Sequence, residues 1–215
     1  MKTLILSLVA IFSMSFITIK HSPPPINIRP LSWTDTDDGT VGTHCTAWAW
    51  KDVNEGVHWI TAAHCVLDEE DSSKVMDVDF QLDGNPVYVE KVDKVKDLAS
   101  LGGGPYASGF PISLLEGKVG DNLYILGFPL GWDNLLFTKG LIGAFDKKFS
   151  DGTSYTVYQL PVAPGDSGGP VFNMDGQVEG VLQISFCDGL FWKGFCPISG
   201  GSSLNDLKTF LGGIE

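Results

Sequence analysis

The chain contains the run GDSGGP at residues 165–170, directly before the apolar stretch Pro170 to Met174. Glycines in this run let the backbone turn tightly, so that the Ser167 hydroxyl is exposed while the N–H groups of Gly165 and Ser167 converge on one point. Donors fixed in this way stabilise the charge that develops on oxygen during acyl transfer, and loss of one donor typically costs about 3 to 4 kcal/mol. The run therefore predicts a nucleophilic serine with an oxyanion hole.

A serine hydroxyl is a weak nucleophile and needs a base, for which histidine is the suitable side chain near neutral pH. The chain has four histidines. His64 ends an apolar predicted strand in the run TAAHC, residues 61–65, where a rigid scaffold can support it. His21 lies in a linker-like region, and His44 and His58 lie inside predicted strands, where a partly exposed strand residue is the simpler interpretation. His64 is therefore the predicted general base.

The imidazole in turn needs a carboxylate that fixes its tautomer and stabilises the imidazolium. Asp97 begins the apolar segment Asp97 to Leu101, and it is expected at a strand edge with its side chain facing inward. Asp93 is the alternative acid. The three predicted catalytic residues are thus His64, Asp97 and Ser167.

Short apolar segments rich in β-branched and aromatic residues alternate with turn signals along most of the chain, which predicts an all-β barrel or sandwich. The first half contains predicted strands at 44–50, 57–61, 75–82, 87–92 and 98–101. The second half contains them at 122–128, 136–145, 155–160, 170–174 and 177–186. Between the last two, the Asp175-Gly176 pair is typical of a hairpin turn.

The C-terminal segment is the part with a helical pattern. Ser203 can cap a helix, Asp206 follows three residues later, and Leu204, Leu207 and Leu211 fall on one face. A short C-terminal helix over residues 203–211 is therefore predicted.

Composition limits the class of protein. A chain of 215 residues with 43% hydrophobic residues suits one functional domain, and 26 glycines with 19% charged residues suit a turn-rich β protein. The formal net charge of −12 disfavours binding to nucleic acid, and no basic stripe studded with aromatic residues is found in the sequence.

The N-terminus resembles an export signal, because Lys2 precedes an uncharged apolar run from Leu4 to Ile19. As a helix this run would be roughly 24 Å long, which is short for a bilayer core of roughly 30 Å. We therefore expect a cleaved signal peptide at residues 1–22, a linker at 23–40, and a secreted, periplasmic or extracellular location. The alternative is an uncleaved segment that tethers the protein to a membrane.

Four cysteines in an exported chain suggest two disulfides, for which the sequence permits three pairings. Loop lengths favour Cys45 with Cys65 and Cys187 with Cys196. Four free thiols are the alternative.

The sequence contains two candidate metal sites. One is a zinc site whose ligands would be His44, Cys45, His64 and Cys65, but adjacent His-Cys pairs lack the usual zinc-ligand spacing. The other is calcium at the acidic stretch Asp68 to Asp71. A solvated loop explains that stretch more simply, so the prediction is no metal and no cofactor.

The runs TAAHC, DLA-x-L and GDSGGP, in this order, resemble the three triad blocks of chymotrypsin-like, or trypsin-like, serine peptidases. The resemblance extends from about residue 40 to the C-terminus. It implies two packed six-stranded antiparallel β-barrels, at about 41–112 and 113–202, followed by the helix at 203–211. It also implies that His64 and Asp97 come from the first barrel and Ser167 from the second. The pairing of Cys45 with Cys65 matches a bridge found in trypsins.

Within that clan, residues 120–131 and 167–181 resemble compact HtrA-type and other bacterial or viral members more than digestive enzymes. No residues follow Leu211 for the peptide-binding PDZ domain that HtrA proteins usually append, so regulation by such a domain is not expected. Cys65 and Asp166 are trypsin-like departures. The aspartate that matches Asp166 binds a new N-terminal ammonium in activated trypsin-like enzymes, but the usual activation sequence is missing here. We therefore expect local hydrogen bonds or another cation at Asp166, without zymogen cleavage.

The resemblance also suggests the substrate-binding residues. Pro161, followed by Val162, stands where trypsin carries the aspartate that selects basic side chains, so cleavage after small or medium apolar residues is expected. The strand Gln183, Ile184 and Ser185 should form the opposite wall and pair with the substrate backbone.

Together these features predict a serine endopeptidase that hydrolyses protein or peptide substrates through an acyl-enzyme. One alternative is a catalytically silent relative that keeps the fold as a binding module. The other is an esterase, or a self-processing viral protease, with the same triad.

Overall fold

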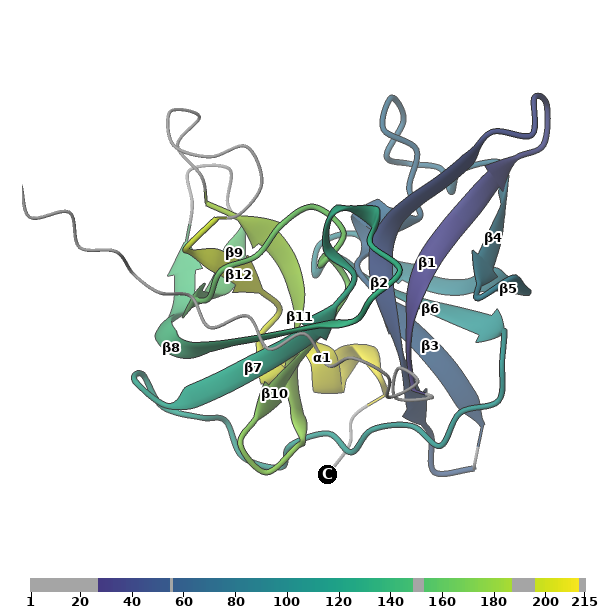
Figure 1. Ribbon diagram of the computed structural model, residues 1–215. Helices are drawn as coiled ribbons and strands as arrows, with labels where there is room; N and C mark the ends of the chain where they lie inside the picture. Colours follow the sequence, from purple (N-terminus) through teal and green to yellow (C-terminus); the bar gives the residue numbers. More distant parts are fainter. Residues whose placement is uncertain (1–26, 55, 149–152, 187–195, 213–215) are drawn as a thin grey trace, which may run out of the picture.

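The computed structural model describes residues 27–54, 56–148, 153–186 and 196–212. Its strands close into two six-stranded antiparallel β-barrels, which lie side by side, and one α-helix lies near the C-terminus (Figure 1). This confirms the predicted all-β fold of two packed barrels with a short C-terminal helix.

The first barrel has the strand order β1-β2-β3-β6-β5-β4. Its strands are β1 (Ile28–Asp35), β2 (Val41–Lys51), β3 (Val57–Thr61), β4 (Val78–Leu82), β5 (Asn85–Asp93) and β6 (Leu98–Gly103). Alternate residues of these strands face inward, as the period of two along a strand requires. Trp59, Leu82 and Leu101, all fully buried, are among the residues that fill the interior.

Strand β1 differs from the linker predicted over residues 23–40. Ile28 and Leu31 are buried, and β1 pairs with β2 along one edge and with β4 along the other. The linker interpretation relied on the local proline and aspartate content. What makes the strand is the pairing with two partners distant in sequence, which closes the barrel and leaves no exposed edge.

The second barrel has the strand order β10-β11-β12-β9-β8-β7. Its strands are β7 (Asn122–Gly127), β8 (Leu136–Lys148), β9 (Ser154–Gln159), β10 (Pro170–Asn173), β11 (Val178–Ser185) and β12 (Ser199–Gly201). The predicted hairpin turn is confirmed, since Gly176 has φ +78° and donates its N–H to the Asn173 carbonyl at 3.1 Å. The three-residue strand β12 was not predicted.

The helix α1 (Leu204–Phe210) confirms the predicted C-terminal helix, and the Ser203 hydroxyl accepts the N–H of Asp206 at 3.0 Å as its cap. One apolar cluster joins the helix to both barrels. It contains Leu207 and Phe210 of the helix, together with residues of the first barrel such as Trp48 and of the second such as Phe172. This shared core fixes the two barrels against each other.

Within the described ranges, no helix is long and apolar enough to span a bilayer. The predicted signal segment at 1–22 lies outside those ranges. So does Cys187, and the pairing of Cys187 with Cys196 therefore stays a prediction.

Candidate active site

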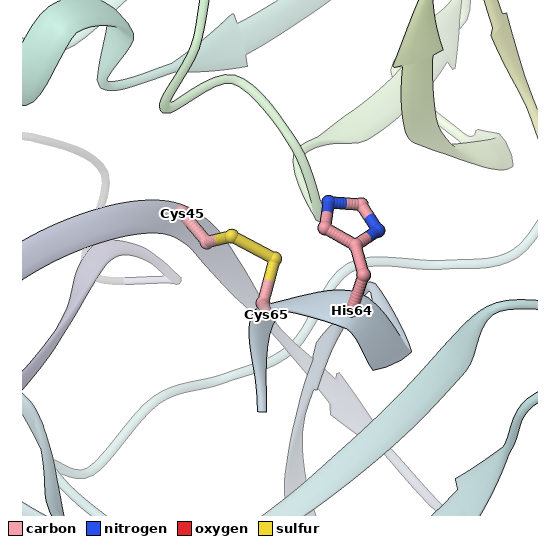
Figure 2. A group of neighbouring side chains, drawn as sticks. All are labelled: Cys45, His64 and Cys65. Atoms are coloured by element: carbon pink, nitrogen blue, oxygen red, sulfur yellow. A yellow bond between two sulfur atoms is a disulfide. The ribbon is translucent and has the colours of Figure 1, made fainter. Parts of the chain in front are cut away.

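His64 lies in the short 3-10 helix η1 (Ala63–Cys65), immediately after β3. Its neighbours Ala62 and Ala63 are fully buried, whereas the imidazole side chain is 46% exposed. Figure 2 shows the disulfide from Cys65 to Cys45 of β2 beside the histidine, as predicted. The backbone of this segment is thus anchored in the barrel, and the ring is accessible.

The disulfide also decides the zinc interpretation. The sulfur atoms of Cys45 and Cys65 and a ring nitrogen of His64 lie within 4.8 Å of one another (Figure 2). Both sulfurs are used in the disulfide, however, and zinc binds thiolates. These three residues therefore do not form a zinc donor set in the oxidised protein. At the acidic stretch, the carboxylates of Asp68 and Asp71 accept backbone N–H groups.

Asp97 uses both carboxylate oxygens on His64. One oxygen, Oδ2, lies 2.8 Å from His64 Nδ1, and the other accepts the His64 backbone N–H at 2.8 Å. Because an ionised carboxylate only accepts hydrogen bonds, Nδ1 carries the proton and Nε2 is left with a free lone pair. This is the tautomer that a general base needs.

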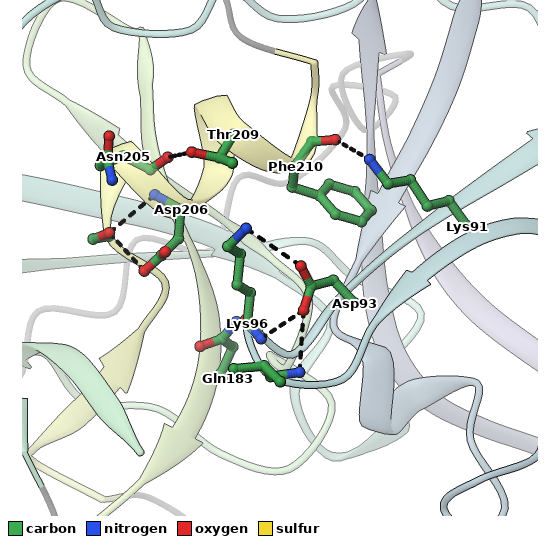
Figure 3. A network of polar contacts seen from close by, with 10 residues as sticks. Lys91, Asp93, Lys96, Gln183, Asn205, Asp206, Thr209 and Phe210 are labelled. Atoms are coloured by element: carbon green, nitrogen blue, oxygen red, sulfur yellow. Dashed lines mark hydrogen bonds and ion pairs between the residues drawn. The ribbon is translucent and has the colours of Figure 1, made fainter. Parts of the chain in front are cut away.

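The turn that carries Asp97 is held from the second barrel. Gln183 of β11 is 5% exposed and lies beside Lys96 (Figure 3), to whose carbonyl its Nε2 donates at 2.6 Å. The same Nε2 donates to the Asp97 carbonyl at 2.9 Å. Asp93, the alternative acid, contacts the Lys96 ammonium at 3.3 Å and accepts the N–H groups of Val95 and Lys96. The carboxylate of Asp93 therefore stabilises the turn, and Asp97 is the acid beside the histidine.

The other histidines lie elsewhere. His58 in β3 is placed between Glu90, with Nδ1 to Oε2 at 2.7 Å, and Asp52, with Nε2 to Oδ2 at 3.4 Å. Although burial opposes protonation, these carboxylates raise the pKa of His58 above its ordinary value. His44 lies in β2 and its side chain is outside the described part, as is the whole of His21.

The segment around Ser167 turns in a way that only glycine allows at two positions. Gly165 and Gly168 have φ of +101° and +82°. A Cβ atom at Gly165 would collide with the Phe128 carbonyl, and one at Gly168 would collide with the Thr61 hydroxyl. Among the described residues, none accepts a hydrogen bond from the N–H groups of Gly165 and Ser167. These two donors are thus available to an oxyanion.

This turn lies against the histidine segment. The Ser167 carbonyl accepts the N–H of Thr46 in β2 at 2.8 Å, and Gly168 lies beside Thr61 and Ala62, just before His64. Within the described ranges, no hydrogen bond joins the Ser167 hydroxyl to His64. Catalytic hydrogen bonds are often long in enzymes without substrate and shorten in the complex.

Asp166 is buried next to the serine, with 1% of its surface exposed. Burial raises its pKa to about 7, against the lowering effect of a hydrogen bond from the Ala163 N–H to Oδ2 at 2.9 Å. A Cβ atom at Gly127 would collide with the other carboxylate oxygen. No cation of the described ranges pairs with Asp166, and the local hydrogen bond is the partner that they provide.

Two of the five residues predicted to bind substrate have buried side chains. Val162 is 2% exposed, packs in the core of the second barrel and pairs by its backbone with Cys196, so its side chain is not accessible to a substrate. Gln183 turns inward to the Asp97 turn, as described above. Val162 lies in an isolated bridge between β9 and β10, and Gln183 lies at a register shift of β11 between Leu182 and Ile184. Pro161 is half-buried, and Ile184 and Ser185 are exposed.

At the exposed end of β11, no strand of the described ranges pairs with one of its two edges. Its ladder with β10 ends at Val181, whereas Ile184 and Ser185 pair with β12 on the other side. An extended peptide can add to such an edge as a further strand.

Comparison with known proteins agrees with this architecture. Residues 45–181 match the family model of the trypsin-like peptidase domain. Probable periplasmic serine endoproteases described as DegP-like, from Pseudomonas putida (strain W619) and Halomonas elongata, are 41% and 39% identical to the chain over 71 residues. That stretch is 32% of this chain, and it spans only 15% of the length of either relative.

Solved structures show the same fold at low sequence identity. The active form of the Rv3671c protease from M. tuberculosis superposes with a TM-score of 0.63 at 19% identity, covering 88% of this chain and 82% of that one. The HtrA-type protease AlgW with a decapeptide gives a TM-score of 0.65 at 16% identity, covering 86% of this chain and 63% of that one.

Proposed function

Since the chain belongs to the family of trypsin-like peptidase domains, we propose that it is a serine endopeptidase with His64, Asp97 and Ser167 as its catalytic triad. The observation that carries the proposal is the contact of 2.8 Å between His64 Nδ1 and Asp97 Oδ2, beside a serine turn whose two N–H donors are free among the described residues. A base of fixed tautomer and an oxyanion hole are the two requirements for acyl transfer to a serine.

The reaction follows from these positions. His64 Nε2 takes the proton of the Ser167 hydroxyl as the oxygen attacks the peptide carbonyl, and the Gly165 and Ser167 N–H groups stabilise the oxyanion. The imidazolium, stabilised by Asp97, gives its proton to the leaving amine, and an acyl-enzyme forms. Water then attacks the ester with His64 again as base, which releases the acid and regenerates the serine. No cofactor takes part in these steps.

Protein or peptide substrates that bind as an added strand along Ile184 and Ser185 fit the open edge of β11. The segments around the serine turn, at 160–163, 184–186 and 198–200, contain no charged residue, and Ile184 and Ile198 are 37% and 41% exposed. This supports cleavage after small or medium apolar side chains. One structural relative, AlgW, was solved with a decapeptide.

A location outside the cytoplasm completes the proposal. Residues 1–22 are proposed as a cleaved signal peptide, and the DegP-like relatives are described as periplasmic. The Cys45–Cys65 disulfide fits an oxidising compartment. The peptidase domain then begins with β1 at Ile28, earlier than the sequence predicted.

The test is covalent labelling with a fluorophosphonate, followed by profiling of a peptide library. Labelling of the wild-type protein that is lost in Ser167→Ala supports the proposed serine endopeptidase. Cleavage after small or medium apolar residues supports the proposed specificity. Folded protein that is not labelled would indicate a silent binding module. Turnover of simple esters without cleavage of casein would indicate an esterase.

A further inference from the structure

A buried threonine of the first barrel contacts the serine turn of the second. Thr46 of β2 is fully buried. Its hydroxyl donates to the Gly165 carbonyl at 2.8 Å and accepts the Phe128 N–H at 3.0 Å. One hydroxyl group thus joins β2 to two segments of the other barrel.

The backbone of the same residue makes two more contacts. The Thr46 N–H donates to the Ser167 carbonyl at 2.8 Å, and its carbonyl accepts the Thr61 hydroxyl at 3.0 Å. Thr46 therefore holds the peptide groups that follow Gly165 and Ser167. These groups flank the two whose N–H donors form the oxyanion hole.

One further peptide group of the turn is held through a segment that Thr46 contacts. The Pro164 carbonyl, in the peptide group whose N–H belongs to Gly165, accepts the Leu130 N–H at 2.5 Å. Leu130 follows Phe128 by two residues, so the Thr46 hydroxyl also fixes the segment that supplies this donor. A turn with its successive carbonyls held in this way has a defined direction for its N–H groups.

The neighbouring aspartate does not supply this restraint. Among the described residues, the Asp166 carboxylate receives one hydrogen bond, from Ala163 in the same turn, and no ion pair to another segment. A bond within the turn does not anchor the turn to the rest of the molecule. The Thr46 hydroxyl does, because it crosses between the barrels.

We infer that Thr46 is the positioning residue of the oxyanion hole, and that its hydroxyl keeps the Gly165 and Ser167 N–H groups aligned without an ion pair at Asp166. The inference rests on the proposed function and adds to it a residue that touches neither substrate nor reacting atoms. Removal of the hydroxyl leaves a buried N–H at Phe128 and a buried carbonyl at Gly165 without a partner, and the Gly165 peptide can then rotate away.

The experiment compares Thr46→Val, which removes the hydroxyl at nearly constant volume, with Thr46→Ser, which keeps it. Thr156→Val is the matched control, because Thr156 is 4% exposed in the second barrel and its hydroxyl bonds to Tyr158, away from the serine turn. The readouts are kcat and KM on a peptide chosen from the wild-type cleavage profile, the rate of fluorophosphonate labelling at Ser167, and thermal unfolding.

For Thr46→Val we expect kcat and the labelling rate to fall by about 100-fold, as for loss of an oxyanion donor, with KM changed by less than about threefold. Thr46→Ser should recover most of the rate, and Thr156→Val should lose stability without this loss of kcat. If Thr46→Val does not fold, Thr46→Ala carries the same comparison, with an expected loss of at least about tenfold.

Wild-type kcat in the folded Val or Ala variant would overturn the inference. So would an equal loss in Thr46→Ser, or an equal loss of kcat in Thr156→Val. In all these cases the wild-type protein is still labelled at Ser167. A wild-type protein without labelling that depends on Ser167 would instead overturn the proposed function, and the inference with it.

Discussion

The two halves of the proposed active site are fixed in different ways. On the histidine side, bonds involving side chains define the geometry: the disulfide from Cys45 to Cys65 and the two contacts of Asp97 with His64. On the serine side, the geometry is in the backbone, with the positive φ angles of Gly165 and Gly168 and hydrogen bonds to main-chain carbonyls. Substitutions should therefore alter the chemistry on the first side and the shape of the turn on the second.

Two aspartates make the contrast specific. Asp97 has 23% of its side chain exposed and accepts two N–H groups of His64. Asp166 is 1% exposed, and its pKa is raised by burial to about 7. Burial favours the protonated form of a carboxyl group, so Asp166 affects stability as pH changes. Asp97 contacts His64 through both carboxylate oxygens and is suited to a role in catalysis.

The largest expected effect is that of Asp97→Asn. The amide that replaces the carboxylate no longer fixes the Nδ1–H tautomer, and kcat should fall by about 10³- to 10⁴-fold with little change in thermal unfolding. Steady-state kinetics on a library-derived peptide would measure it.

Asp93→Asn is the control for this prediction, because Asp93 lies in the same turn but contacts Lys96 and not His64. It should reduce kcat by no more than about threefold, as expected for one partly exposed ion pair. A larger loss in Asp93→Asn than in Asp97→Asn would mean that the acid is wrongly assigned and that the histidine side is not as described.

Removal of the disulfide should come next in size. The bridge joins residues 20 apart in sequence, and closure of a loop of this length stabilises a protein by about 3 kcal/mol. The double variant Cys45→Ala/Cys65→Ala should lose about this much free energy of unfolding in denaturant titrations. It should lose activity as well, because η1 carries His64. Unchanged stability would show that the barrel alone holds the histidine segment.

Asp166→Asn tests the serine side through pH. The folded-state pKa of about 7 lies above the ordinary value of 3.8, so the folded protein keeps a proton that the unfolded chain has lost between these two values. The contribution of Asp166 to stability therefore falls as pH rises through this window. Above about pH 7 the buried carboxylate is ionised, and its full destabilising effect on the fold is present. Between pH 4 and pH 8, the variant should gain several kcal/mol in free energy of unfolding relative to wild type, because each unit of the pKa difference corresponds to about 1.4 kcal/mol.

Asp93→Asn should change the free energy of unfolding in the opposite direction over the same pH range. Although burial opposes it, the hydrogen bonds and charge of Lys96 hold the pKa of Asp93 below its ordinary value, so ionised Asp93 stabilises the fold above that value. This variant should thus lose stability relative to wild type as pH rises. Parallel pH profiles for wild type and Asp166→Asn would mean that Asp166 has a charged partner.

The sequence predicted the elements whose cause is local. The turn at Gly176 and the cap at Ser203 both depend on residues within a few positions, and both are confirmed. Strands β1 and β12 were missed because their cause is distant. Pro30 and Asp35 read locally as a linker, and Ser199 to Gly201 has no apolar side chain, so only the pairing with neighbouring strands makes them strands.

The same limit applies to the site. The three proposed triad residues stand in recognisable runs, whereas Thr46 and Gln183 act on residues 119 and 86 positions away. Gln183 was predicted, from the family resemblance, to lie in a strand that pairs with the substrate backbone. Its side chain is buried beside a register shift of β11 and donates to the carbonyls of Lys96 and Asp97. One feature of the sequence could have indicated this role. Gln183 stands among apolar strand residues, and a buried glutamine needs a hydrogen-bond partner.

Gln183→Leu should have the smallest effect, and it tests whether the second barrel positions the acid of the first. Loss of the two hydrogen bonds leaves the carbonyls of Lys96 and Asp97 without these donors, at a cost of about 1 to 3 kcal/mol in stability. Asp97 has a left-handed φ of +49°, which is unfavourable for a residue other than glycine and needs support. We expect kcat to fall about tenfold as the carboxylate shifts, with KM nearly unchanged.

Gln177→Leu is the matched control, because Gln177 is a partly buried glutamine whose hydrogen bonds go to Asn173 in the β10–β11 turn. It should lower stability to a similar extent and leave kcat within about twofold of wild type, since that turn is remote from the acid. If Gln183 positions Asp97, Gln183→Leu should lower kcat and displace the pH dependence of kcat, and Gln177→Leu should do neither. A general loosening of the barrel would instead affect both variants alike. If Gln183→Leu raises KM and leaves kcat unchanged, Gln183 contributes to substrate binding and does not position Asp97. Contacts between the barrels would then position only the serine turn.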